Sequence, residues 1–179
     1  MKKGVYMIKV KVKKLSNTAL LPTRATDGAA GYDLYADSTG PLVDYKEWAE
    51  DKMSYKEKKV YMLYEGYTVV VPTGIAISIP KGYVGLIYPR SGRATKHGLR
   101  LANSVGVIDS DYRGEVKVAL HLDPQFDGHG SFKRIEFVIE PGERIAQIVF
   151  KKYEEADWEL VDELDETARS SGGFGSTGL

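Results

Sequence analysis

The sequence predicts an all-β fold, a barrel or a sandwich, and two observations carry this prediction. Short apolar stretches recur along the chain, several of them with period-two alternation, and glycine or proline separates them. Turn signals such as I-P-K-G and E-P-G-E lie between these stretches. Many short strands at this spacing are typical of antiparallel folds and not of βαβ units. The predicted strands cover residues 5–12, 68–71, 75–79, 83–88, 115–122, 135–139 and 145–150.

The bounds of these strands follow from local signals. Residues 68–71 are β-branched and are followed by Pro72, which cannot donate to a strand ladder. Residues 75–79 read I-A-I-S-I, which has the period of a half-buried strand. Residues 83–88 follow a glycine, and Pro89 then ends their pairing.

A charged segment at residues 44–59 interrupts this pattern, within an insertion of about residues 40–60. Ten of its sixteen side chains are charged, and Asp44 followed by Glu47 resembles a capping box. We therefore expect a short amphipathic helix. It is either a solvated surface helix or a contact for a protein partner through its apolar side chains. The side chains at helical spacing include Tyr45, Trp48, Ala49 and Met53.

Composition narrows the class of protein. The chain has 179 residues, which fits a single domain, and 25 basic residues balance 25 acidic ones. A formal net charge of zero argues against a nucleic-acid binder and leaves room for a small anionic ligand. No cysteine is present, which excludes disulfides and thiolate metal sites. Lysines interrupt the apolar start, and no stretch reaches membrane-spanning length. We expect a soluble intracellular, cytoplasmic protein, with nuclear or organellar placement left open.

Two stretches in the first half of the chain carry candidate site residues. A-A-G-Y-D-L-Y-A places Asp33 among small and apolar residues, where it either caps a turn or serves a site. Y-P-R-S-G-R-A-T-K-H-G brings together Arg90, Ser91 and a glycine turn at Gly92. Such a trio suits an anionic oxygen, because arginine makes charge-assisted bonds and a glycine turn directs its amides outward. The alternative is an ordinary loop rich in serine and glycine.

The stretch L-A-N-S-V-G-V-I-D-S-D-Y-R-G-E, residues 101–115, is the densest in candidate residues. Asn103 offers both a donor and an acceptor, as recognition of a base edge requires. Gly106 allows a hairpin bend. Asp109 and Asp111 would point the same way if they lie on a strand. The alternative is a turn rich in Asp, Tyr and Gly.

Two later stretches complete the set. In P-G-E-R-I-A-Q-I-V, Gln147 is a polar residue within a predicted strand, so it either faces solvent or serves a site. The chain closes with R-S-S-G-G-F-G-S-T-G-L, residues 169–179, whose composition predicts a tail that is not packed.

Taken together and in this order, these stretches resemble the motif set of the trimeric deoxyuridine triphosphatases (dUTPases). That family hydrolyses dUTP to dUMP and pyrophosphate, which limits uracil in DNA and supplies dUMP for thymidylate synthesis. The matching stretches are A-G-Y-D-L, P-R-S-G-R-A, N-S-V-G-V-I-D-S-D-Y-R-G-E, G-E-R-I-A-Q-I-V and R-S-S-G-G-F-G-S-T-G. The resemblance implies a β jelly roll over residues 1–168, a homotrimer with sites at its interfaces, and a mobile glycine-rich lid at 169–179.

The resemblance also implies a role for each candidate residue. Asp109 would orient and deprotonate the water that attacks the α-phosphorus of dUTP. Mg²⁺ would be the cofactor, held mainly by triphosphate oxygens and waters, with Asp33 contacting metal-bound waters. The base and sugar would contact Asn103, Val105, Gly106, Val107, Tyr112 and Phe174. The phosphates would contact Arg90, Ser91, Gly92, Gln147, Arg169, Gly175, Ser176 and Thr177.

Three features depart from the family pattern. Arg93 stands where an apolar residue is common, Ser170 stands where glycine is usual, and the insertion is the largest difference. Two alternatives are a dCTP deaminase of the same fold family, which lacks the I-D-S-D-Y-R-G-E stretch, and a regulatory nucleotide-binding module, which the insertion motivates. The intact Asp109 and the complete tail favour a working dUTPase.

Overall fold

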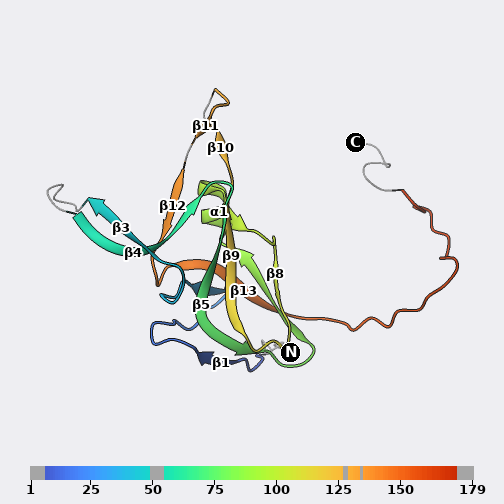
Figure 1. The fold of residues 1–179 in the computed structure, drawn as a ribbon. Helices are drawn as coiled ribbons and strands as arrows, with labels where there is room; N and C mark the ends of the chain where they lie inside the picture. Colours follow the sequence, from blue (N-terminus) through green and yellow to red (C-terminus); the bar gives the residue numbers. More distant parts are fainter. Residues whose placement is uncertain (1–6, 49–54, 127–128, 134, 173–179) are drawn as a thin grey trace.

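The structure, a computed structural model, describes residues 7–48, 55–126, 129–133 and 135–172. Figure 1 shows strands wrapped around one core, with a short helix at one end and a C-terminal segment that leaves the barrel. The helix is α1 (Ser91–His97). The strands are β1 (Lys11–Lys14), β2 (Tyr32–Tyr35), β3 (Val43–Trp48), β4 (Tyr55–Tyr64), β5 (Thr68–Ser78), β6 (Tyr83–Pro89), β7 (Leu99–Leu101), β8 (Gly106–Ile108), β9 (Glu115–Leu122), β10 (Gln125–Phe126), β11 (Phe132–Lys133), β12 (Glu136–Ile139) and β13 (Arg144–Lys152).

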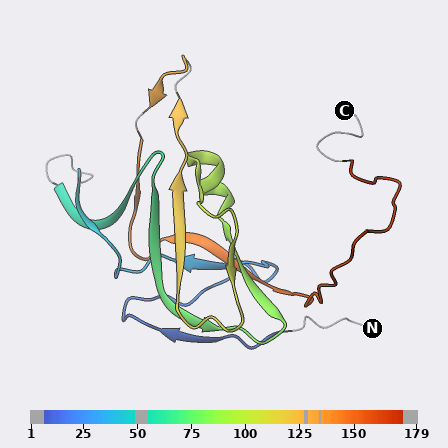
Figure 2. The ribbon, with the colours of Figure 1, turned by 45° about the vertical axis from the view of Figure 1, so that its right-hand side comes forward.

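Two four-stranded antiparallel sheets enclose the core. One has the order β1-β5-β9-β7 and the other β2-β13-β6-β8, and Figure 2 shows β5 and β9 running side by side. Along β9 the inward positions alternate with outward ones, so Val116, Val118 and Leu120 are buried. They share one apolar cluster with Ile87 of β6 and Ile148 of β13. The all-β prediction is confirmed, and the crossed strand order is that of a jelly roll.

β5 joins two stretches that were predicted as separate strands. Pro72 lies inside β5, and the ladder with β9 shifts its register after this residue. Gly74 follows with φ of 67°, and a β-carbon there would lie 2.7 Å from Cγ of Asp37. The predicted break at Pro72 is therefore a bulge within one long strand, a position at which a sheet tolerates proline.

Asp37 is a buried carboxylate that ties the N-terminal segment to this bulge. Its Oδ1 accepts hydrogen bonds from the hydroxyls of Ser16 and Thr18, each at 2.7 Å, and its Oδ2 accepts one from Thr39 at 2.8 Å. Burial alone would raise the pKa of Asp37, but these hydrogen bonds and one from the Ser38 backbone outweigh it and lower the pKa. The residue is thus held as a charged anchor of the fold.

The helix predicted within residues 44–59 is wrong wherever the structure describes this segment. β3 and β4 form an antiparallel hairpin, and residues 49–54 lie outside the described residues. β4 runs on to pair with β12, so a three-stranded sheet fixes its conformation. Strand pairing of this kind overrides a local helical spacing, because the preference for a strand depends strongly on its neighbours.

Ion pairs between β3 and β4 also help to explain why this charged segment forms a hairpin and not a helix. Lys59 Nζ lies 2.8 Å from Asp44 Oδ1, and Lys46 Nζ lies 3.0 Å from Glu57 Oε1. Opposite charges that face each other stabilise a strand pair. The hydrogen bond and the charge of Lys59 lower the pKa of Asp44. The high charge of this segment therefore serves a ladder between strands.

The predicted strand at residues 5–12 is only partly correct. β1 begins at Lys11 and pairs along β5, from Ser78 to Ile75, as an edge strand with four exposed side chains. Residues 7–10 are not in a strand, and residues 1–6 lie outside the described part of the chain. Only the later part of the lysine-rich stretch reaches the sheet edge.

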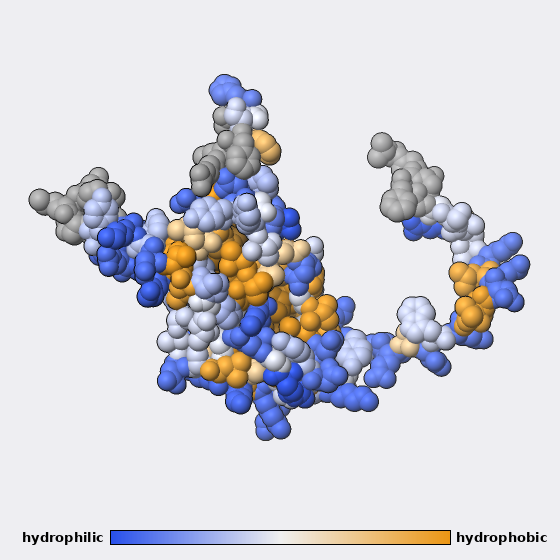
Figure 3. All heavy atoms as spheres, viewed as in Figure 1, coloured by the Kyte–Doolittle hydropathy of each residue, from blue (hydrophilic) through white to orange (hydrophobic). Residues whose placement is uncertain are grey.

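The C-terminal segment beyond β13 does not pack on the barrel. Trp158 is 91% exposed, Leu160 is 100% exposed and Leu164 is 85% exposed. Figure 3 shows orange, hydrophobic atoms on the extended C-terminal segment, apart from the barrel. In the described part of the chain, no helix is both long enough and apolar enough to cross a membrane.

Candidate active site

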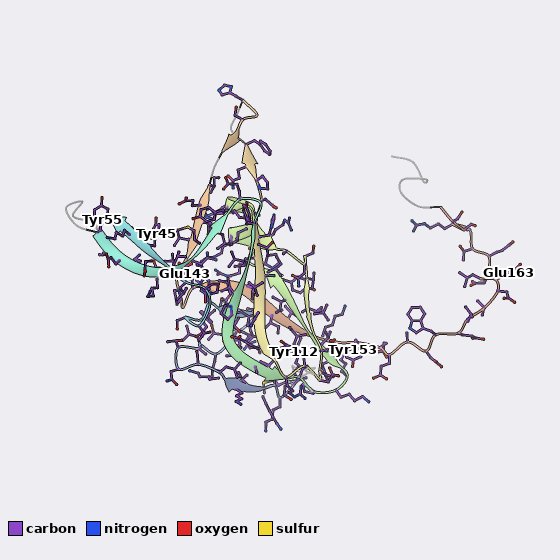
Figure 4. All side chains as sticks on the ribbon, viewed as in Figure 1. Tyr45, Tyr55, Tyr112, Glu143, Tyr153 and Glu163 are labelled. Carbon is purple, nitrogen blue, oxygen red and sulfur yellow. The ribbon has the colours of Figure 1, made fainter. Side chains whose placement is uncertain are left out.

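Two clefts in the barrel contain most of the predicted site residues that the structure describes, and they share no lining residue. The arginine cleft is lined by Gly31, Asp33, Arg90, Ser91, Gly92, Arg93, Lys96, Glu143, Gln147 and their neighbours. The Asp109 cleft is lined by Lys81, Val84, Val107, Asp109, Asp111, Arg113, Tyr153 and their neighbours. In Figure 4, Glu143 of the first cleft and Tyr153 of the second lie on opposite sides of the barrel.

Arg90 and Asp33 form the charged centre of the arginine cleft. Arg90 Nε lies 3.2 Å from Asp33 Oδ1, and Arg144 Nη1 lies 3.4 Å from Asp33 Oδ2. Asp33 lies on β2 opposite Gln147 of β13, so the alternative in which it caps a turn is wrong. A guanidinium has N–H donors on its Nη atoms besides Nε, so Arg90 can hold Asp33 and still bind an anion.

Gln147 is fixed at the back of this cleft. Its Nε2 donates a hydrogen bond to the Pro89 carbonyl at 3.1 Å. A β-carbon on Gly31 would lie 2.3 Å from its Oε1, so the amide would have to shift if residue 31 carried a side chain. The two motifs A-G-Y-D-L and G-E-R-I-A-Q-I-V are thus in direct contact. Of the two possibilities for Gln147, the structure favours a place in a cleft.

Ser91 and Gly92 were expected in a glycine turn, and that expectation is wrong. They form the first residues of α1, with Arg90 as the N-cap residue, and Gly98 ends the helix with φ of 67°. Arg93, Ala94 and Lys96 favour a helix, and a left-handed glycine is a common way to end one. Both residues nevertheless line the arginine cleft.

The charge of Arg93 is balanced within the same cleft. Its Nη2 forms an ion pair with Glu143, and its guanidinium lies over the ring of Phe137, 5.4 Å from the centroid. The neighbouring Glu140 pairs with Lys58 of β4 at 2.6 Å, and this contact, together with Glu47, raises the pKa of Lys58. The turn between β12 and β13 thus connects the inserted hairpin to α1.

Asp109 directly follows β8, at the start of a tight turn. The Tyr112 N–H donates to the Asp109 carbonyl at 3.2 Å. Asp109 and Asp111 are exposed residues of this turn and not of a strand, so the strand-based argument for their common direction is wrong. Both still line the Asp109 cleft, together with Lys81 and Tyr153.

A second turn, at Asn103, precedes β8. Ser104 adopts φ of 61°, and the Val105 N–H donates to the Asn103 carbonyl at 2.6 Å. The predicted bend at Gly106 is therefore made by Ser104. Gly106 is needed for another reason, since a β-carbon there would lie 3.1 Å from Cβ of Ile87.

The tail motif is described only in part. Arg169 Nε donates to the Gly172 carbonyl at 2.8 Å, within an exposed turn. Residues 173–179, and with them Phe174, Gly175, Ser176 and Thr177, lie outside the described residues.

Some residues of the two clefts were not predicted from the sequence. Arg144 lines neither cleft but pairs with Asp33 of the arginine cleft, and its signal was its position two residues before A-Q in the fourth motif. Lys96 reaches the arginine cleft four residues after Gly92, a relation that appears only once residues 91–97 are known to be helical. Lys81 and Tyr153 lie outside the five stretches that match the dUTPase family.

Comparison with known proteins agrees with the five motifs. Residues 55–178 match the dUTPase family. The chain is 44% identical over 171 residues to the deoxyuridine 5'-triphosphate nucleotidohydrolase of Rickettsia bellii, covering 95% of each sequence. The chain therefore belongs to the dUTPase family.

Solved structures give the same answer for the fold. A mutant dUTPase of Staphylococcus bacteriophage 80alpha, solved with dUpNHpp, aligns with a TM-score of 0.74 and 27% identity over 97% of this chain and all of that one. A mutant dUTPase from phage phi11 of S. aureus, described with a structural Mg(II) ion, aligns with a TM-score of 0.64 over 87% of this chain and 98% of that one, at 24% identity. The barrel is thus the dUTPase jelly roll.

Proposed function

We infer that this chain hydrolyses dUTP to dUMP and pyrophosphate. One observation carries the inference: a member of the dUTPase family retains Asp109 in one cleft and Asp33, Arg90 and Gln147 in the other. The test is pyrophosphate release from dUTP, dCTP, dTTP and UTP in parallel, with and without Mg²⁺. We expect release from dUTP alone. Ammonia release from dCTP would instead indicate a deaminase, and binding of dUTP without turnover a regulatory module.

In this proposal the arginine cleft binds the triphosphate. Arg90 supplies charge-assisted hydrogen bonds, Ser91 a hydroxyl, and Gln147 an amide on a rigid strand. Asp33 and Glu143 offset part of the positive charge of Arg90 and Arg93 in the cleft. The bound phosphates would thus be positioned chiefly by hydrogen-bond geometry.

The Asp109 cleft lies against the α-phosphate and the nucleoside part of dUTP in this proposal. Asp109 is the general base that takes a proton from the attacking water, and the bond from the α-phosphorus to the pyrophosphate oxygen breaks. Tyr112 packs against the deoxyribose and leaves no room for a 2′-hydroxyl. The turn at Asn103, with Val105, Gly106 and Val107, reads the uracil edge through its backbone and amide.

We propose Mg²⁺ as the cofactor. In the described residues no group of three or more His, Asp or Glu could hold a metal by itself, so the ion would bind mainly through phosphate oxygens and water. Asp33 fits such a role, because a carboxylate has about four lone-pair sites and its contacts with Arg90 and Arg144 occupy one on each oxygen. When bound, the ion would neutralise charge that develops on the pyrophosphate.

We propose that the enzyme is a homotrimer whose sites lie between subunits. Two clefts without a common residue can serve one nucleotide if each comes from a different chain. Trp158, Leu160 and Leu164 are also exposed, and exposed apolar clusters mark interaction surfaces, so these side chains would pack against another subunit. The tail at 169–179 would then close over the nucleotide, with Arg169, Gly175, Ser176 and Thr177 on the phosphates and Phe174 on uracil. A cytoplasmic location fits an enzyme of the nucleotide pool.

Mixed trimers test the shared site. Asp109→Asn and Arg90→Ala subunits are each inactive alone in this proposal. After mixing in equal amounts, unfolding and reassembly, about a quarter of the sites would combine an intact Arg90 with an intact Asp109 from another chain, and activity would return to that extent. No recovery in mixed trimers would place each site within one chain. Separately, removal of residues 169–179 would lower turnover without unfolding the barrel.

A further inference from the structure

We propose that Arg113 is a positioning residue, which holds the loop that carries Asp109 and Tyr112 in its active shape. This inference rests on the proposed function, in which Asp109 activates water and Tyr112 contacts the sugar. Arg113 lines the Asp109 cleft, but its contacts within the chain are to the loop itself.

The geometry is that of a clamp on the backbone. Arg113 Nη1 donates to the Ser110 carbonyl at 2.7 Å and to the Tyr112 carbonyl at 2.8 Å. One guanidinium nitrogen therefore joins two carbonyl oxygens on either side of Asp111. Hydrogen bonds from a charged donor are stronger than neutral ones, and they bridge two oxygens that would otherwise repel each other.

The clamp acts on a loop without ladder support. Residues 109–114 lie between β8 and β9, and the hydrogen bond from the Tyr112 N–H to the Asp109 carbonyl closes their turn at 3.2 Å. The arginine contacts thus decide how rigidly the base is presented. A misplacement of about 1 Å in a catalytic group can lower the rate about 100-fold.

Tyr112 is held from a second side. Its hydroxyl donates to the Glu115 carbonyl at 3.0 Å, and its ring covers Gly114, where a β-carbon would lie 2.4 Å from the hydroxyl oxygen. Glu115 in turn accepts a hydrogen bond from the Gly74 N–H at 2.9 Å. The loop is therefore braced by Arg113 on one side and by the β5 bulge on the other.

The proposal predicts a distinctive kinetic change. Arg113→Ala would lower kcat for dUTP by about 100-fold while KM stays within about threefold, because the loop is loosened and no phosphate contact is lost. Selectivity for dUTP over UTP would fall about tenfold, because Tyr112 is no longer fixed. Arg113→Lys, which keeps the charge without the planar fork, would lie in between, and added guanidinium ion would restore part of the Arg113→Ala rate.

Two further variants make the test decisive. Arg100→Ala is the control, because Arg100 is also a partly exposed arginine but pairs with Asp123 outside both clefts, at 2.6 Å. Gly114→Ala displaces Tyr112 while leaving Arg113 in place, so a loss of selectivity with a near-normal kcat would show that the position of Tyr112 sets the selectivity. If Arg113→Ala fails to fold, Arg113→Lys carries the test, and wild-type kcat and selectivity in that variant would overturn the inference.

The outcomes separate this inference from the proposed function. Wild-type kcat and selectivity in Arg113→Ala would overturn the inference, and a raised KM with unchanged kcat would show instead that Arg113 contacts phosphate. Wild-type protein without activity on dUTP would contradict the proposed function itself. An active Asp109→Asn variant would contradict the assignment of Asp109 as the base, and with it the mechanism and this inference, while leaving hydrolysis of dUTP itself in place.

Discussion

The side chain of Gln147 occupies the space that a side chain at residue 31 would need. A β-carbon on Gly31 would lie 2.3 Å from Gln147 Oε1 and 3.2 Å from its Cδ, while Nε2 is held by the Pro89 carbonyl. Gly31 precedes β2 and Gln147 lies in the middle of β13, so the contact joins two distant parts of the sequence. The glycine of the first motif is thus explained by the glutamine of the fourth.

Gly31→Ala is expected to weaken triphosphate binding without unfolding the protein. The methyl group displaces the Gln147 amide, and the loss of one hydrogen bond corresponds to about a three- to tenfold rise in KM for dUTP. Steady-state kinetics and thermal unfolding measure the two effects. Gly28→Ala is the matched control, since a β-carbon there meets nothing within 4 Å. Equal kinetics in both variants would remove Gln147 from the phosphate site.

Arg93→Leu is expected to restore an apolar residue with little effect on catalysis. Glu143 already balances the charge of Arg93, and leucine can keep the contact with the ring of Phe137. KM for dUTP would change less than about threefold, and stability by about 1 kcal/mol or less, as for other partly exposed pairs. A KM raised tenfold would instead show that Arg93 itself binds phosphate.

Asp37 is expected to make stability depend on pH in the acid range. Its pKa in the folded protein lies below the ordinary value of 3.8, so its contribution is present above that value and is lost as pH falls through the folded pKa. Asp37→Asn would lower the free energy of unfolding at pH 7 by about 1–3 kcal/mol. Urea unfolding would show a smaller difference between the two proteins near pH 3. A difference independent of pH would contradict the account.

The inserted hairpin is expected to be dispensable for hydrolysis. Val43 and Val60 face each other in the ladder, so an Asn-Gly turn can replace the residues between them. Among the described residues, the hairpin reaches another element through one ion pair, that of Lys58 with Glu140, and such an exposed pair contributes little. Turnover of dUTP would therefore stay within about threefold. Loss of activity or of the trimer would show that the hairpin supports the site. Light scattering and pyrophosphate release are the measurements.

The sequence predicted the barrel well where burial alternates strictly. The predicted strand at residues 115–122 coincides with β9, whose inward side chains form part of the core. It failed where the neighbours of a segment decide its conformation, as in the paired strands β3 and β4. It also placed a break at Pro72, because the bulge there depends on Asp37 and Gly74, which no local pattern reveals.

For the site, the motifs predicted which residues matter better than how they are held. Arg90, Gln147 and Asp33 do share one cleft. The pairing of Asp33 with Arg144 and the clamp of Arg113 on its own loop could not be predicted, because they depend on side-chain positions set by the turns. The tail residues from Phe174 onward remain predictions.

The most direct test of the central claim is a comparison of wild-type protein with Asp109→Asn, measuring both pyrophosphate release from dUTP and equilibrium binding of a non-hydrolysable dUTP analogue in the presence of Mg²⁺. The substitution removes the base and keeps the shape of the side chain. We expect turnover to fall by about 1000-fold or more and the dissociation constant of the analogue to change less than about threefold. Turnover that stays near the wild-type rate would contradict the assignment of Asp109 as the base and with it the proposed mechanism.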